Sequence, residues 1–465
     1  MIETWTEEHD VLVIGSGFAG LSAAIEAREA GADVLILEKM RAYGGNSIIS
    51  DGGIAAPATQ LQEKHGIEDS ANKMYDDMLT SGLGLNDPLL VRTLVDTAND
   101  AFEWSINYLG VEYLDRVDIF GGHSVPRCYT AKNISGATII KKQIQKIQKL
   151  NISIVYSSFV KGLICNSAGA VCGVVVRKGY DYMNPDKGSD IFIKANKGVI
   201  IASGGFSSDV DFRTLQDPRL TKSLESTNKP FATAEVLRQA MEIGAETEQL
   251  SSIQLGPWAS PDERGYGVGP QFSEYIVFQY GVIIDPTTGN RFVNELADRK
   301  TLSDALLSIG HPCIGIADSK AVTTSGWNID HGLKKKVIRK FDTLDELALF
   351  YSVPIEKLAK TITDFNQSAL HGIDSLYGKP FIKNSAPIKN PPYYAMRLWP
   401  KVHFTMGGLK INDKTEVIHT NGTVITGLYA AGEVTGGVHG ASRLGSCSIT
   451  DCLVFGRIAG ENAAQ

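Results

Sequence analysis

The sequence predicts an α/β fold built around a parallel sheet, with an α+β domain inserted into the chain of the first domain. The first observation is a set of short, continuous apolar runs at residues 11–14, 34–37 and 199–202, which are typical of parallel strands buried on both faces. The second is an alanine-rich helical pattern over residues 21–30, between the first two runs. The third is a change of texture over residues 250–372, where aromatic residues and short helical segments replace the regular alternation.

The chain has 465 residues, a length that favours two domains over one. We expect a discontinuous first domain at residues 1–249 and 373–465, and an inserted capping domain at residues 250–372. Period-two alternation predicts antiparallel strands over 152–178 and 190–194. Helical spacing predicts further helices within 68–150, at 232–244 and at 448–463.

The composition restricts the kinds of partner. With 43% hydrophobic and 21% charged residues it is that of an ordinary globular protein, and a net charge of −7 argues against nucleic acid, whose binding calls for a basic surface. No apolar run reaches the length of a membrane span. Residues 1–10 are polar and acidic, so the chain as given carries no signal peptide. We expect a periplasmic location if a leader has been removed and a cytoplasmic location otherwise.

The cysteines are scattered and form neither CxxC nor CxxCH, so the sequence predicts no bound metal, iron–sulfur cluster or covalent haem. They are best explained as small, mostly buried residues. The six are Cys128, Cys165, Cys172, Cys313, Cys447 and Cys452. If the chemistry is redox, the electrons must therefore come from outside this chain.

A glycine motif follows the first apolar run directly. Gly15, Gly17 and Gly20 form GxGxxG between a buried strand and a helix, and Glu38 ends the next strand about twenty residues later. The N-terminus of such a helix offers unpaired N–H groups and a positive dipole to a pyrophosphate. A carboxylate at Glu38 can accept hydrogen bonds from ribose hydroxyls. The pattern predicts that the first domain is Rossmann-like and binds a dinucleotide.

A second glycine-rich turn lies near the C-terminus, within residues 427–445. An apolar strand leads into it, Glu433 is its one carboxylate, and Arg443 follows among small residues. Glycine lets the backbone approach a cofactor closely, and a guanidinium can bind a carboxylate through two parallel hydrogen bonds. The segment therefore predicts contact with both a cofactor and an anionic substrate.

Four separated motifs together resemble the FAD-binding flavoprotein family of fumarate reductases and succinate dehydrogenases. They are the GxGxxG turn, the loop around Asn46, the glycine pair Gly204-Gly205 and the turn around Glu433. Nearest in pattern are the soluble flavocytochrome-type reductases of fumarate, methacrylate or urocanate, and the resemblance spans almost the whole chain. It implies a glutathione reductase-type FAD-binding domain with a capping domain inserted. It also implies noncovalent FAD, because Asn46 stands where membrane-bound relatives carry the histidine that binds FAD covalently.

The resemblance implies a set of residues that bind the cofactor. Glu433 would bond the ribityl chain of the flavin, and Gly204 and Gly205 would line the nucleotide. The full expected set is Gly15, Gly17, Ala19, Gly20, Glu38, Lys39, Gly45, Asn46, Ser47, Gly52, Gly53, Gly204, Gly205, His403, Gly432, Glu433, Arg443, Ser448 and Ile449.

Four side chains resemble the family's machinery for reduction. Arg299 matches the arginine that acts as general acid, and Glu274 matches a carboxylate that relays protons. Arg443 and His403 match ligands of the substrate carboxylate. The resemblance implies hydride transfer from flavin N5 to the β-carbon of an α,β-unsaturated carboxylate, with the proton from Arg299. We expect burial and a nearby second cation to make that proton available. Without the resemblance, Arg299 reads as a surface residue in an ion pair, and His403 as a core histidine.

Two departures from the family pattern concern the other end of the substrate. Fumarate reductases carry a histidine where this chain has Gly256, and an arginine where it has Val277. Both missing side chains would hold the second carboxylate of fumarate, and Trp258 and Tyr275 lie nearby in sequence. Burying an unpaired carboxylate there would be costly, whereas an apolar group would gain about 25 cal/mol per Å². We therefore predict a monocarboxylate such as acrylate, methacrylate or an aryl acrylate.

Other functions stay open on the sequence. Fumarate reduction is one alternative, and an FAD-dependent 3-ketosteroid dehydrogenase is another, although the pair Arg299 and Arg443 argues against a steroid substrate. An oxidase of the aspartate oxidase type and a non-enzymatic flavin-binding module are weaker interpretations. The missing CxxCH, with no second GxGxxG for NADH, favours an external electron donor such as a multihaem cytochrome c.

Overall fold

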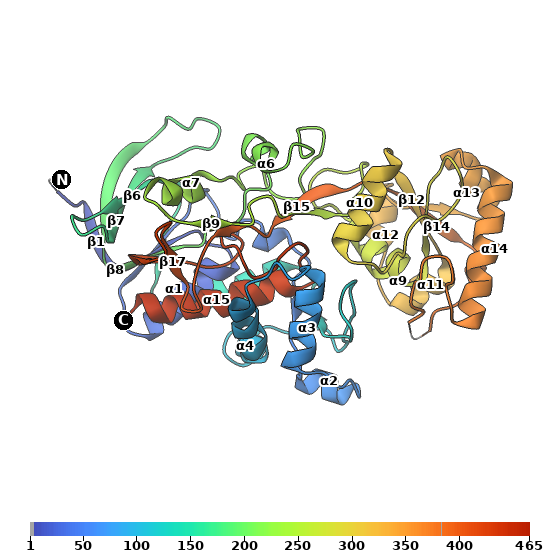
Figure 1. Cartoon of the computed structure of the whole chain (residues 1–465), viewed down its shortest axis with the longest axis horizontal. Helices are drawn as coiled ribbons and strands as arrows, with labels where there is room; N and C mark the ends of the chain where they lie inside the picture. The colour runs from blue at the N-terminus through green and yellow to red at the C-terminus, as the bar shows by residue number, and fades with distance from the viewer. Residues whose placement is uncertain (1–3, 383) are drawn as a thin grey trace.

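The computed structural model describes residues 4–382 and 384–465 and has two lobes (Figure 1). The larger lobe contains the main sheet and both ends of the chain. The smaller lobe contains α10 (Arg299–Ile309), α13 (Leu344–Tyr351) and α14 (Ile355–His371). This arrangement confirms the predicted α/β fold with an inserted second domain.

The main sheet has a parallel core in the order β18-β8-β1-β2-β5. These strands are β18 (Val424–Ala430), β8 (Ser189–Ile201), β1 (Glu7–Ile14), β2 (Val34–Leu37) and β5 (Ser153–Val155). Val11, Leu12 and Val13 of β1 are fully buried, which explains why this strand is a continuous apolar run. The chain continues from β1 to its neighbour β2, and from β8 to its neighbour β18 on the opposite side. A crevice is expected at the ends of β1 and β8, where the connections diverge.

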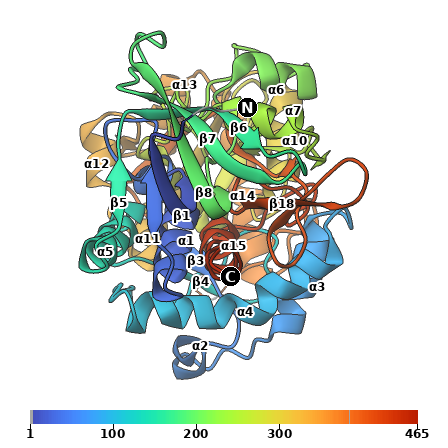
Figure 2. The same ribbon diagram turned by 90° about the vertical axis from the view of Figure 1, so that its left-hand side faces the viewer.

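The larger lobe is completed by antiparallel strands and by helices packed on the sheet. β6 (Ser158–Cys165) pairs with β7 (Val171–Lys178), which pairs with β8, and β17 (Glu416–Ile418) pairs with β18. Helix α1 (Phe18–Glu29) lies beside α15 (Cys447–Ala463) (Figure 2). A Cβ at Gly460 of α15 would lie 2.2 Å from the carbonyl oxygen of Ala23, so only glycine permits this close helix contact.

The remaining elements of the larger lobe surround this core. They are η1 (Ser47–Ile49), β3 (Gly53–Ala55), α2 (Gln60–Lys64), α3 (Ala71–Ser81), α4 (Pro88–Asn107), β4 (Cys128–Thr130), α5 (Gly136–Lys149), α6 (Val210–Gln216), α7 (Glu235–Glu242), β9 (Thr247–Glu248) and β16 (Gly408–Leu409). Within the part of the chain that the structure describes, no helix is both long enough and apolar enough to cross a membrane.

The smaller lobe has its own antiparallel sheet in the order β11-β12-β14-β13. The strands are β11 (Val282–Ile284), β12 (Cys313–Asp318), β14 (Tyr393–Leu398) and β13 (Arg339–Phe341). Leu358 and Phe365 of α14 pack with Ile316 of β12 into a separate apolar core. β14 lies beyond residue 372, the boundary of the inserted domain predicted from the sequence. That boundary missed β14 because its pairing with the distant strand β12 leaves no local signal in the sequence. We propose that the inserted domain continues to Leu398.

Two adjacent strands carry the chain between the lobes. β10 (Ile253–Gly256) leads into the smaller lobe, β15 (Lys401–Thr405) leads back, and the two pair antiparallel. Figure 1 shows β15 running from one lobe to the other. Residues on these strands therefore lie at the junction of the lobes. The remaining elements of the smaller lobe are α8 (Gly269–Phe272), the π-helical turn η2 (Ser273–Val277), α9 (Phe278–Tyr280), α11 (Ser319–Ser325) and α12 (Asp330–Lys334).

Candidate active site between the two lobes

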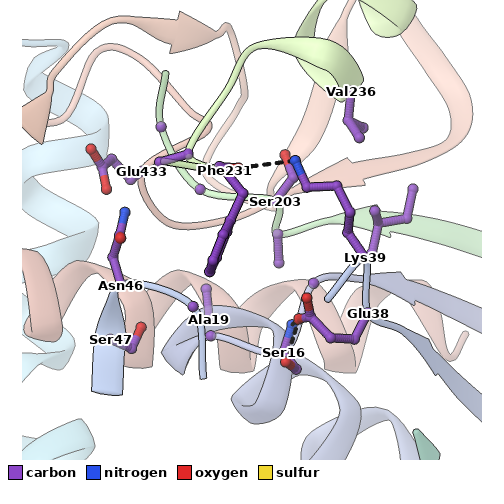
Figure 3. A pocket seen from close by; sticks show the side chains of 18 of the residues that line it. Ser16, Ala19, Glu38, Lys39, Asn46, Ser47, Ser203, Phe231, Val236 and Glu433 are labelled. Carbon is purple, nitrogen blue, oxygen red and sulfur yellow. Dashed lines mark hydrogen bonds between the residues drawn. The ribbon is translucent and has the colours of Figure 1, made fainter. Parts of the chain in front are cut away.

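A long cavity lies where β1, β2 and β8 end (Figure 3). The space free of protein atoms in it, with the adjoining open solvent included, is about 960 Å³. Figure 3 shows Asn46 and Glu433 on one side of Phe231, and Glu38 and Lys39 on the other. The predicted cofactor residues that line it are Gly15, Gly17, Ala19, Glu38, Lys39, Gly45, Asn46, Ser47, Gly204, Gly205 and Glu433.

The GxGxxG turn shapes one end of this first cavity. Glu38 accepts hydrogen bonds from the backbone N–H of Ser16 (3.2 Å) and from its hydroxyl (2.5 Å). Gly15 has a φ of +107°, and a Cβ at Gly20 would lie 2.1 Å from the carbonyl oxygen of Gly15. The glycines therefore bring α1 close to β1. The N–H of Phe18, the first residue of α1, donates to the Ser47 hydroxyl (3.1 Å), and the turn directs the N-terminus of this 12-residue helix at the cavity.

Lys39 and Asn46 tie the segment that forms the opposite wall of the first cavity to the N-terminal motifs. The Lys39 ammonium donates to the carbonyl of Phe231 (2.9 Å) and to the hydroxyl of Thr233 (3.1 Å). The amide oxygen of Asn46 accepts from the backbone N–H of Lys229 (2.9 Å). Lys39 thus holds the wall of the cavity in place.

A second cavity of about 820 Å³ adjoins the first at the junction of the lobes. Phe18, Asn46, Ser47, Glu433 and Cys452 line both, so one elongated ligand can span the two. The predicted residues that line this second cavity are Asn46, Ser47, Gly53, Arg299, His403, Glu433, Arg443, Ser448 and Ile449.

Helix α15 begins in the wall of the second cavity. Its N-cap, Ser446, has a φ of 65° and makes no side-chain capping bond, and Ser448 and Ile449 of the first turn line the cavity. The helix is 17 residues long, so its uncapped first turn adds the positive end of a helix dipole. This end of the cavity favours an electron-rich group.

Glu433 lies where the two cavities meet. It accepts a hydrogen bond from the backbone N–H of Thr405 (3.0 Å). Burial raises the pKa of Glu433 to about 7, and the Thr405 N–H and Arg443 offset only part of this effect. A Cβ at Gly205 would lie 2.4 Å from a carboxylate oxygen of Glu433, so residue 205 must be glycine for Glu433 to sit there.

Arg299 and Glu274 form a buried ion pair in the second cavity's wall. The distance from Nη2 to Oε1 is 2.6 Å, and the side chains are 11% and 7% exposed. Arg299 is the first residue of α10, which Asp298 caps by accepting two backbone N–H bonds. Glu274 lies in the π-helical turn η2, a feature that is frequent at functional sites.

Arg443 reaches the same cavity from the larger lobe. The Arg443 guanidinium lies 4.6 Å from the centre of the Phe404 ring. The backbone carbonyl of Arg443 accepts a hydrogen bond from the side-chain amide of Gln254 (2.9 Å). The Ser442 hydroxyl donates to the Asp298 carboxylate at 3.3 Å. This bond ties the segments that carry the two arginines across the junction of the lobes.

The two arginines differ in how firmly they hold their protons. Burial, and then the charge of Arg299, lowers the pKa of Arg443 to about 10. Burial also acts to lower the pKa of Arg299, but the adjacent Glu274 outweighs it and the pKa is raised. Burial raises the pKa of Glu274 despite Arg299. The sequence-based expectation of an acidified Arg299 is therefore wrong for the paired state, because the effect of a second cation falls on Arg443.

Three N–H groups around this cavity are buried without a hydrogen-bond partner among the described residues. They are Nη1 of Arg299, Nε of Arg443 and Nε1 of Trp258. Unpaired buried donors are costly, so they indicate that an acceptor is missing. Two of the three belong to cations, and an anionic ligand with oxygen atoms complements this set.

His403 is a neutral member of the site. Its Nδ1 lies 2.7 Å from the hydroxyl of Thr227. Burial, followed by the charges of Arg443 and Arg299, holds the pKa of His403 well below its usual range. When the Thr227 hydroxyl donates to Nδ1, the ring proton is on Nε2, where it can donate to a ligand.

The indole of Trp258 covers Gly256. A Cβ at Gly256 would lie 2.6 to 2.9 Å from three carbon atoms of that ring. Trp258 is 1% exposed, and its ring meets those of His403 and Tyr266 at centroid distances of 4.6 and 5.4 Å. The position where the resemblance to fumarate reductases implies a histidine is thus filled by an aromatic face.

Some predicted residues lie near the cavities without lining either of them. Gly20, Gly52 and Gly432 serve close packing instead: a Cβ at Gly432 would lie 2.9 Å from Cβ of Ala19. Glu274 lines a separate small cavity and reaches the second one only through its bond to Arg299.

The sequence reasoning missed several residues that line the second cavity, namely Asp51, Phe120, Thr227 and Tyr266. Asp51 directly precedes the expected pair Gly52-Gly53, which was a usable local signal. Thr227 and Tyr266 had none, because their contacts join residues far apart in the chain.

Comparisons with known proteins identify the family. A family model described as FAD binding domain matches residues 10–449. The chain is 42% identical to the acrylate reductase flavoprotein subunit of Shewanella woodyi, over 98% of this chain and 91% of that protein. It also matches the open conformation of a flavocytochrome c3 fumarate reductase, with 33% identity, a TM-score of 0.78, and coverage of 99% of this chain and 78% of that one.

A further structural match bears on the steroid alternative. The 3-ketosteroid-Δ4-(5α)-dehydrogenase of Rhodococcus jostii has a TM-score of 0.79 at 24% identity, covering 100% of this chain and 98% of that one. At this identity the match shows a shared fold only.

The nucleotide motif, the two joined cavities and these matches define an FAD-dependent oxidoreductase. The chain belongs to the FAD-binding flavoprotein family that includes flavocytochrome fumarate reductases. The residues present fit this cofactor: Glu38 and the N-terminus of α1 suit its adenosine and phosphate end, and the uncapped α15 suits the electron-rich edge of a flavin.

Proposed function

We propose that the protein reduces the C=C bond of a small α,β-unsaturated monocarboxylate, such as acrylate or methacrylate, with FAD as its redox cofactor. One observation carries the proposal: Arg443, His403 and Arg299, which is paired with the buried Glu274, meet at one cavity that continues into the dinucleotide cavity. The similarity to a protein named as the flavoprotein subunit of an acrylate reductase supports it.

The cavity residues divide the chemistry among them. When bound, reduced FAD supplies a hydride for the β-carbon of the substrate. Arg443 and the Nε2–H of His403 hold the substrate carboxylate and stabilise the negative charge that develops on it and on the α-carbon. Arg299 gives a proton to the α-carbon, and Glu274, 2.6 Å away, restores it. This pair suits a proton relay, because Glu274 keeps Arg299 protonated until negative charge develops on the α-carbon.

The wall at Gly256 supports a monocarboxylate. The resemblance to fumarate reductases implies a histidine there for a second carboxylate, but the Trp258 indole fills that space and offers no cation to the cavity. A second carboxylate against this wall would lose its hydration without gaining a cation. A hydrogen, a methyl group or a flat apolar substituent, as in an aryl acrylate, would gain contact area instead.

Two further points of the proposal concern the cofactor and the electron donor. Asn46 lines both cavities, and its amide is not a nucleophile, so we propose that FAD is held noncovalently. The Shewanella woodyi relative is named as one subunit of an enzyme, which supports an external electron donor for this chain, such as a multihaem cytochrome c. A periplasmic location would follow from that donor.

Fumarate reduction is the second candidate, since the chain is 33% identical to a flavocytochrome c3 fumarate reductase. The absence of a histidine at Gly256 weighs against it. A 3-ketosteroid dehydrogenase is weaker still, because a steroid ketone does not need two buried guanidiniums.

Substitution of Arg299 tests the proposed function. Oxidation of reduced methyl viologen by acrylate should fall by more than about 100-fold in Arg299→Ala, the range expected for loss of a general acid. Flavin absorbance should show that FAD stays bound. Arg299→Lys, which keeps a charge beside Glu274, should also lose activity and guards against misfolding. Lys300→Ala, at the next and exposed position, is the matched control. Robust turnover by both Arg299 variants would refute the assignment.

A further inference from the structure

The side chain of Asp51 lines the substrate cavity. The proposed mechanism does not use this carboxylate. It follows the helical turn η1 and lines the second cavity together with Arg299 and Arg443. Its Oδ1 accepts from the backbone N–H of Gly53 (3.1 Å). Its Oδ2 accepts from the hydroxyl of Tyr275 at 2.7 Å and faces that of Tyr266 at 3.4 Å.

These partners hold the Asp51 side chain without neutralising it. Both hydroxyls are buried donors from the smaller lobe, whereas Asp51 belongs to the larger lobe, so the contact spans the junction. Within the described part of the chain, Asp51 makes hydrogen bonds to neutral groups only. The cavity wall therefore holds an acidic side chain that neutral donors fix in place.

The field of Asp51 reaches the reacting groups. Its charge is among the causes that raise the pKa of Arg299 and of Glu274. Two guanidiniums line this cavity with Asp51, and that of Arg299 is paired with Glu274. Arg443 is in no ion pair among the described residues, so it can receive one substrate carboxylate. A second carboxylate would add a negative charge with no cation to receive it.

We propose that Asp51, positioned by Tyr275 and Tyr266, is a specificity-determining residue that rejects a second carboxylate on the substrate by charge repulsion. The inference rests on the proposed function and deepens it, since it adds an electrostatic barrier to the aromatic wall at Trp258. The barrier acts on dianions only: neutral substituents on the β-carbon do not feel it.

Ligand binding without turnover tests this inference separately from the proposed reaction. The saturated acids propionate and succinate can be titrated into the oxidised holoenzyme while the flavin spectrum is followed. We expect the wild type to bind propionate more tightly than succinate. Asp51→Asn should shift the ratio of the two dissociation constants toward succinate by about 10- to 100-fold, as removal of a like charge a few ångströms away predicts. Asp51→Glu, which keeps the charge, should stay near the wild-type ratio.

A matched control and two contrary results complete the design. Asp262→Asn removes a carboxylate that pairs with the partly exposed Arg397 outside the cavity, and should leave the ratio unchanged. A ratio in Asp51→Asn within about twofold of the wild type would overturn the inference. So would wild-type protein that binds succinate as tightly as propionate, a result that needs no variant to fold. A wild type with the expected binding preference but without acrylate reduction would refute the proposed function alone.

Discussion

Glu274→Gln separates the proton relay from the binding of substrate. The substitution keeps the size of the side chain and removes the charge that lies 2.6 Å from Arg299. In the reaction, Arg299 then has no carboxylate to restore its proton, so kcat should fall by about 10²- to 10⁴-fold, the usual contribution of a general acid or base. That range corresponds to about 3–5 kcal/mol of barrier height. KM for acrylate should change little, because Arg443 and His403 stay in place.

The same variant also affects the free energy of unfolding. Both side chains are nearly buried, and an ion pair becomes a hydrogen bond from the guanidinium to a neutral amide, which costs about 1–3 kcal/mol. Steady-state assays with reduced methyl viologen give kcat and KM, and denaturant titration gives the stability. Glu246→Gln is the control, since it breaks a partly exposed pair with Lys410. A Glu274→Gln enzyme with wild-type kcat would show that protons reach Arg299 by another route.

Two further predictions concern the substrate wall and pH. Trp258→Phe should lower kcat/KM for crotonate relative to acrylate by about tenfold, because the smaller ring loses apolar contact with the β-methyl group; an unchanged ratio in competition assays would show that Trp258 does not form the wall at the β-carbon. The pKa of Glu433 is raised to about 7 in the folded protein, so the contribution of Glu433 to the stability of the cofactor-free protein should be fully present below about pH 4.5 and be lost as the pH rises from 4.5 to about 7. Glu433→Gln should flatten that slope in urea titrations, and a slope that is unchanged would contradict the assigned pKa.

The sequence alone predicted the parts of the site that short motifs encode. The turn of Gly15 and Gly17, the acid Glu38 and the turn around Glu433 each depend on neighbouring residues, and all line the cofactor cavity. Arg299 was identified only through the family pattern, since a helix-start arginine in isolation has no special signal. Its partner Glu274 lies 25 residues away, and the structure brings the two together through a π-helical turn.

Long-range packing determined what the sequence could not predict. Asp51 and Tyr275 are 224 residues apart and meet only because the lobes close on one another. The missing histidine at Gly256 was visible in the sequence, but the indole that fills its place depends on how Trp258 folds back on β10. In the same way, β14 joins the smaller lobe through pairing with β12, which a local change of composition does not reveal.

The most direct test of the proposed function is the choice of electron acceptor by the wild-type holoenzyme. Oxidation of reduced methyl viologen should be followed with acrylate, methacrylate and fumarate under identical conditions, and kcat/KM determined for each. The geometry of Arg443, His403, Trp258 and Asp51 predicts a higher kcat/KM for acrylate or methacrylate than for fumarate. A much higher kcat/KM for fumarate would contradict the assignment of a monocarboxylate substrate.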